Sequence, residues 1–115
     1  MVGDHLREAG WNVIEAGSGE DALACLEQAT EIDVVFTDIR LNGPLNGWDV
    51  GEACRRSNTD LPVIYASGQT IEPPRNVDGS LFFDKPYDPE QIRVACERLF
   101  VERCERMKTN HSTLS

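Results

Sequence analysis

The stretch Val34-Val35-Phe36-Thr37-Asp38 decides the fold class of this chain. It is apolar at successive positions instead of alternating, which is typical of a parallel strand buried on both faces. Two other hydrophobic runs also stop at a polar residue: Leu61 to Ala66 is followed by Ser67, and Leu81 to Asp84 by Lys85. Parallel strands that lie side by side bring their last residues to one edge of the sheet, where open α/β sheets place their sites. The sequence therefore predicts a carboxylate, a hydroxyl and an ammonium at one sheet edge.

Strand and helix patterns alternate along the chain, and this alternation predicts a parallel sheet with helices on both faces. The expected strands are 12–16, 33–37, 61–67 and 81–83, and the expected helices are 3–9, 18–29, 48–56 and one that starts at Pro89. The segment between Gly68 and Gly79 contains two prolines and no helical stripe, so the crossover helix there is expected to be reduced to a loop or a turn. We expect one domain over 1–105 and a polar, disordered tail over 106–115.

The composition narrows the class of partner. The chain has 115 residues and a formal charge of −9, from 20 acidic and 11 basic residues. This charge repels nucleic acid and anionic lipid, so a protein partner fits better. The four cysteines form no C-x-x-C pair and the two histidines lie at opposite ends, which disfavours a zinc site and indicates reduced thiols. No signal-peptide pattern or membrane-spanning run is present, and we expect a cytoplasmic protein.

Three motifs in combination resemble the receiver domain of two-component response regulators: V-V-F-T-D-I-R-L from Val34, P-V-I-Y-A-S-G from Pro62 and F-F-D-K-P from Phe82. The resemblance runs from about Leu6 to Leu99. It implies a CheY-like, flavodoxin-like fold, a doubly wound parallel sheet of (βα)5 type, here with the first strand missing and the fourth helix reduced. It also implies a bacterial phosphoprotein that signals through contacts with other proteins.

The same resemblance assigns a role to each polar strand end. Asp38 is expected to accept a phosphoryl group, Lys85 to neutralise one phosphoryl oxygen and Ser67 to hydrogen-bond another. Phe82 matches the aromatic residue whose rotamer reports phosphorylation, and movement of Ser67 would vacate the space into which its ring turns. The peptide bond before Pro86 is a candidate for the cis form, because only X-Pro bonds adopt cis at low cost.

The family holds Mg²⁺ with a pair of acids at the end of a first strand, and this chain starts after that point. Asp38 and the backbone carbonyl of Arg40 alone would supply too few oxygens for the near-octahedral coordination that Mg²⁺ prefers. The missing strand would lie between 12–16 and 33–37. We therefore expect the chain to form a homodimer or exchange elements to cover the gap, unless its start is placed too far downstream.

The sequence leaves several functions to compare. The favoured one is a single-domain receiver, not an enzyme, which takes a phosphoryl group from a sensor histidine kinase or phosphotransfer protein and contacts a downstream protein. A pseudo-receiver that works without phosphorylation is the alternative. The pattern Gly17-Ser18-Gly19-Glu20-Asp21-Ala22 fits the dinucleotide motif G-x-G-x-x-A, but Glu20 and Asp21 would crowd a pyrophosphate with negative charge. A phosphatase would need an acid where Arg40 stands.

Overall fold

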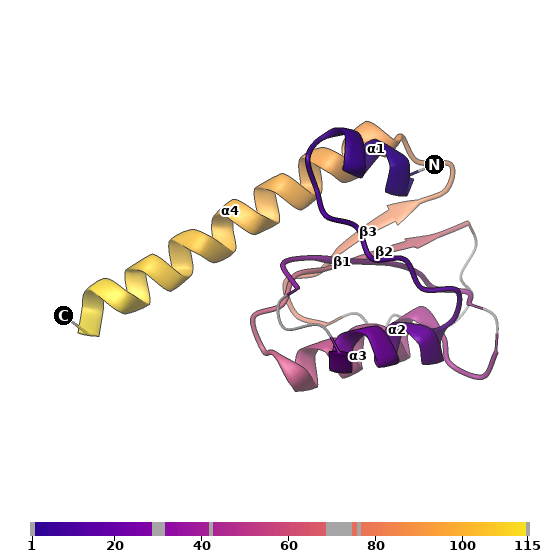
Figure 1. Ribbon diagram of the computed structural model, residues 1–115, viewed down its shortest axis with the longest axis horizontal. Coiled ribbons are helices and arrows are strands. Elements are labelled where there is room, and N and C mark those ends of the chain that lie inside the picture. Colours follow the sequence, from indigo (N-terminus) through magenta and orange to yellow (C-terminus); the bar gives the residue numbers. More distant parts are fainter. Residues whose placement is uncertain (1, 29–31, 42, 69–74, 76, 115) are drawn as a thin grey trace.

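The computed structural model describes the backbone of residues 2–28, 32–41, 43–68, 75 and 77–114, and the side chains of these residues up to 105. At its centre is a parallel sheet in the order β1-β2-β3 (Figure 1), made of β1 (Val35–Asp38), β2 (Val63–Ser67) and β3 (Leu81–Asp84). All residues of β2 are buried, as expected for the central strand. The predicted parallel α/β sheet is confirmed.

Helices cover both faces of the sheet (Figure 1). On one face lie α2 (Gly19–Gln28) and α3 (Gly47–Ser57), and on the other lie α1 (Val2–Glu8) and α4 (Pro89–Leu114). Side chains alternate along β2: Val63 and Tyr65 pack toward α2 and α3, whereas Ile64 packs with Ile92 and Leu99 of α4. The result is two apolar layers separated by one sheet, which is the doubly wound arrangement.

Residue Gly47 fixes the loop after β1 to the start of α3. Its backbone N–H donates to the carbonyl of Ile39 at 2.7 Å, and a Cβ placed on it would lie 2.1 Å from the carbonyl oxygen of Asp38. Only glycine allows this approach. One residue earlier, Asn46 is the N-cap of α3 and forms a reciprocal capping box with Asp49. The start of α3 therefore holds the backbone at Asp38 in place.

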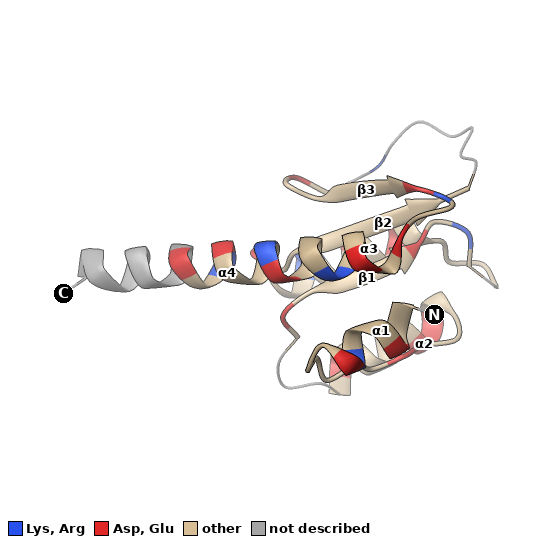
Figure 2. Cartoon of the chain, turned by 90° about the horizontal axis from the view of Figure 1, so that it is seen from above, with Lys and Arg blue, Asp and Glu red and all other residues tan. Residues whose placement is uncertain are grey.

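The predicted strand 12–16 is wrong, because this described segment has no regular secondary structure. The ladder explains why. Val35 and Ile39 donate to carbonyls on the β2 side, so Phe36 and Asp38 between them direct their backbone groups to the opposite edge, where no described strand lies. Seen from above (Figure 2), α1 and α2 lie beside this edge, on the side away from β2. Without a strand between them, 12–16 and β1 cannot pair.

Two further sequence predictions concern the C-terminal tail and the crossover before β3. The backbone of 106–114 continues α4 as a helix, where the sequence predicted a disordered tail; no glycine or proline interrupts this segment, and Glu105, Met107 and Lys108 are good helix formers. The reduced crossover helix falls mostly on 69–74 and 76, outside the described residues, while 75 and 77–80 are not helical. Charged residues recur along α4, and none of the described helices is apolar enough over sufficient length to cross a membrane.

Candidate functional site

The three polar strand ends do meet at one edge of the sheet. In the register, Asp38 lies opposite Ala66, and Ser67 lies opposite Asp84. The backbone bonds continue past the strand ends, since Ile39 N–H donates to Ala66 and Lys85 N–H donates to Ser67, both at 2.9 Å. Asp38, Ser67 and Lys85 are therefore positioned by the ladder itself and not by a flexible loop.

The carboxylate of Asp38 presents two different oxygens. Oδ1 is buried and lies 2.9 Å from Nζ of Lys85, close enough for an ion pair but without the angles of a hydrogen bond. The side chain as a whole is 40% exposed, so the exposure falls on the remainder, which includes Oδ2. Both partners are substantially solvated, so the pair contributes little to stability, of order 0–1 kcal/mol. The ion pair matters because of where it places the two groups. The ammonium of Lys85 lies against Oδ1 of Asp38 and leaves Oδ2 open to an incoming group.

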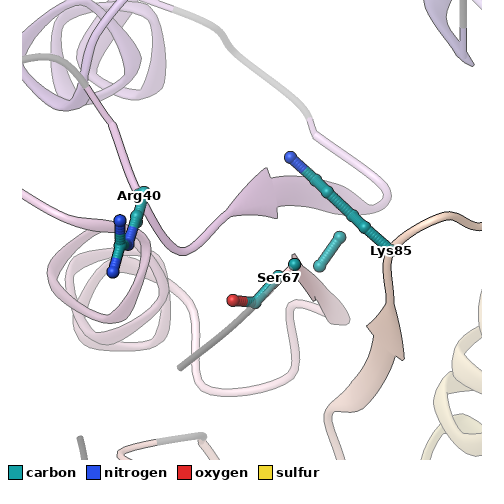
Figure 3. Close-up of a pocket in the computed structure, with 5 residues that line it drawn as sticks. Arg40, Ser67 and Lys85 are labelled. Atoms are coloured by element: carbon teal, nitrogen blue, oxygen red, sulfur yellow. The ribbon is translucent and has the colours of Figure 1, made fainter. Parts of the chain in front are cut away.

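A pocket of about 370 Å³ adjoins this ion pair. It is lined by Arg40, Ala66, Ser67, Gly68 and Lys85. Figure 3 shows Ser67 between Arg40 on one side and Lys85 on the other. Ser67 is 5% exposed, and it lines the pocket together with the two basic residues Arg40 and Lys85. A hydroxyl and two cations around a small cavity form a suitable environment for a tetrahedral anion.

The aromatic residue Phe82 lies on the outer part of an aromatic cluster. Its side chain is 45% exposed and stacks on Trp48, with ring centroids 6.2 Å apart. Trp48 is fully buried and also contacts Tyr65, at 4.7 Å. The ring of Phe82 is thus in the outward position. The sequence did not predict that Trp48 packs between Phe82 and Tyr65. The only signal for this contact was an aromatic residue in the first turn of a helix that packs on the sheet.

A phenol lies near the Asp38 carboxylate, and an arginine is anchored on α3. Burial raises the pKa of Tyr87, and the nearby charge of Asp38 raises it further. Arg75 pairs with Asp49 at 3.0 Å and with Glu52 at 2.7 Å, which ties this residue to α3. The pKa of Asp49 is lowered, first by the backbone hydrogen bond from Asn46 and then by Arg75. These contacts fix α3 on its exposed side.

The residues described here do not make a complete Mg²⁺ site. No group of three or more His, Cys, Asp or Glu side chains comes together in the described part of the chain. Asp38 offers one carboxylate, whose buried oxygen already faces Lys85. That donor set does not fit an ion that requires near-octahedral oxygen coordination. The magnesium requirement stays a prediction. The predicted cis peptide bond before Pro86 is present.

Comparison with known proteins identifies the family. The sequence model of the response regulator receiver domain matches residues 1–97. The chain belongs to this family. A receiver protein from Sinorhizobium medicae has a crystal structure that is similar, with a TM-score of 0.82 and 31% identity over 89% of this chain and 84% of that one. The predicted CheY-like receiver fold is therefore confirmed.

Another solved structure and one sequence relative are also similar to this chain. A CheY-like receiver domain from Methanospirillum hungatei has a TM-score of 0.80 at 17% identity, over 91% of this chain and 86% of that one, which shows the fold alone. The probable transcriptional regulatory protein TcrX of Mycobacterium tuberculosis is 31% identical over 96 residues, which are 80% of this chain. The chain spans about 40% of the length of that relative. The receiver assignment places this chain in two-component signalling.

Proposed function

We propose that this receiver accepts a phosphoryl group on Asp38 from a phosphohistidine of a sensor kinase or phosphotransfer protein. The observation that carries the proposal is the asymmetry of the carboxylate: Lys85 lies 2.9 Å from Oδ1, while the rest of the side chain is exposed, and Lys85 also lines a pocket together with Ser67. A nucleophile needs one free oxygen and a cation near the charge that develops. Both features are present at this edge of the sheet.

The proposed step conserves atoms and charge. Oδ2 of Asp38 attacks phosphorus, and the bond from phosphorus to the histidine nitrogen of the donor breaks in line. The electron pair of that bond returns to the imidazole. Asp38 becomes an acyl phosphate, so its own negative charge is lost and Lys85 is released to bind a phosphoryl oxygen. Ser67 donates its hydroxyl hydrogen to another oxygen of the same group.

The output of this step is a change in packing on the face that carries Phe82. Movement of Ser67 toward the phosphoryl group draws in the chain that follows it, and the ring of Phe82 leaves Trp48 and turns inward. The altered face then binds a downstream protein. The acidic surface, with carboxylates spread over the helices (Figure 2), supports a protein partner over nucleic acid. In this proposal the chain is a signalling module and not an enzyme, and a cytoplasmic location remains a prediction of the sequence.

A pseudo-receiver is the second candidate, because the described residues do not supply a complete set of metal ligands. Incubation with acetyl phosphate and Mg²⁺, followed by a Phos-tag gel, separates the two. The proposal expects a shifted band for the wild type and none for Asp38→Asn. Asp84→Asn is the matched control, since Asp84 is an exposed acid at the same sheet edge. No shifted band in the wild type would favour the pseudo-receiver.

A further inference from the structure

Residue Arg40 is a second basic residue at the pocket that Ser67 and Lys85 also line. It follows Ile39 in the loop after β1 and lines the pocket together with Ser67 and Lys85. In Figure 3, Arg40 and Lys85 lie on opposite sides of Ser67, so the pocket is bordered by positive charge from two different strand ends. The sequence motif drew attention only to the backbone carbonyl of Arg40, not to its guanidinium.

The side chain of Arg40 has no interaction partner among the described residues. It is exposed and makes no ion pair or hydrogen bond with the described residues, unlike most of the arginines up to residue 105. Arg75 and Arg93, for example, are each held by two carboxylates. Arg40 can therefore turn toward an anion in the pocket without breaking a contact. Arg56 is also exposed and free of such contacts in the described structure, but it does not line the pocket.

The phosphorylated site would carry more negative charge than one lysine offsets. A phosphoryl group carries about −1.5 to −2 charges near neutral pH. Lys85 supplies one positive charge at this edge of the sheet. A guanidinium binds phosphoryl oxygens in a bidentate manner, which a lysine cannot do. Arg40 is the cationic side chain that lines the pocket on the side of Ser67 away from Lys85.

We propose that Arg40 is a phosphoryl-binding residue, whose guanidinium binds the oxygens on the side opposite Lys85. This inference rests on the proposed function, because it assigns a further residue to the same acceptor site. This role of the guanidinium differs from the role of the Arg40 backbone carbonyl as an oxygen ligand for Mg²⁺. Substitution of the side chain leaves that carbonyl in place. Removal of the side chain therefore tests the guanidinium alone.

The test uses two probes of different kinds. Beryllofluoride bonds to a carboxylate and mimics its phosphoryl group, whereas inorganic phosphate binds without a covalent bond. Both are titrated by NMR at one fixed Mg²⁺ concentration into the wild type, Arg40→Ala, Arg40→Lys and the matched control Arg56→Ala. We expect Arg40→Ala to weaken beryllofluoride binding about tenfold, as one charge-assisted contact at an exposed site would. Arg40→Lys should recover part of this loss, and Arg56→Ala should bind within about twofold of the wild type.

The outcomes separate this inference from the proposed function. Equal beryllofluoride affinity of wild type and Arg40→Ala would overturn the role of Arg40 while leaving Asp38 as acceptor. Phosphate binding that depends on Arg40, without beryllofluoride binding to any variant, would support the cationic pocket and overturn phosphoryl acceptance. If the wild type binds neither anion, both fall. Spectra recorded without ligand confirm that each variant is folded, which is expected because Arg40 is exposed.

Discussion

Substitution of Gly47 by alanine tests how α3 holds the phosphoacceptor loop. The new Cβ would lie 2.1 Å from the carbonyl oxygen of Asp38 and 2.8 Å from Cα of Ile39, closer than the 3.0 Å that such contacts essentially never go below. These are backbone atoms, so they cannot turn away. Overpacking costs about 1–3 kcal/mol, and loss of the 2.7 Å bond from Gly47 to Ile39 adds about 1 kcal/mol. Alanine regains at most about 1 kcal/mol of helix propensity, so a net loss of about 1–3 kcal/mol is expected.

Urea denaturation followed by circular dichroism measures this loss. The midpoint should fall by about 0.5–1.5 M for a slope of about 2 kcal/mol per M. Gly17→Ala is the control, because its Cβ would meet the nearest atom of Asp21 at an ordinary 3.5 Å. That variant should stay within about 0.5 kcal/mol of the wild type. A Gly47→Ala protein as stable as Gly17→Ala would refute the claim that this close approach fixes the loop.

Three further predictions follow from the structure. Hydrogen bonds from Arg93 and then from His5 lower the pKa of Glu90 from 4.5 to about 2, so this carboxylate stabilises the folded state above pH 4.5 and loses that effect as the pH falls to 2. The thermal midpoint of the wild type should therefore fall more steeply over that range than that of Glu90→Gln, and parallel curves would contradict the pairing. Burial raises the pKa of the Cys54 and Cys96 thiols to about 11, so native protein at pH 8 should react with a disulfide reagent at Cys25 and Cys104 first, with all four reacting in urea. In a Trp11→Phe background, phosphorylation should change the emission of Trp48 as Phe82 leaves it, and a response that persists in Phe82→Leu would count against this movement.

The strand ends could be predicted from the sequence because parallel strands impose the arrangement. The expected parallel strands are neighbours, namely 33–37, 61–67 and 81–83. Their ends must therefore lie at the same edge of the sheet, independent of the loop conformations, and this brings together Asp38, Ser67 and Lys85. The predictions that held were those set by backbone geometry, and the first helix ends at Glu8, shortly before Gly10 with its positive φ of 98°.

The misses came from tertiary context. The segment 12–16 has a strand-like pattern, but a strand needs a paired neighbour, and no described strand lies at the open edge of β1. The stacking of Phe82 on Trp48 and the position of the Arg40 side chain depend on packing between distant segments, which no local pattern reports.

The central claim is that Asp38 is the acceptor, and locating the modified residue tests it most directly. Protein treated with phosphoramidate is reduced with borohydride, which converts an aspartyl phosphate to homoserine, and is then digested with trypsin. The account predicts homoserine at position 38, in the peptide that ends at Arg40. Homoserine at another acidic position, or none in protein that is folded and was exposed to the donor, would contradict it.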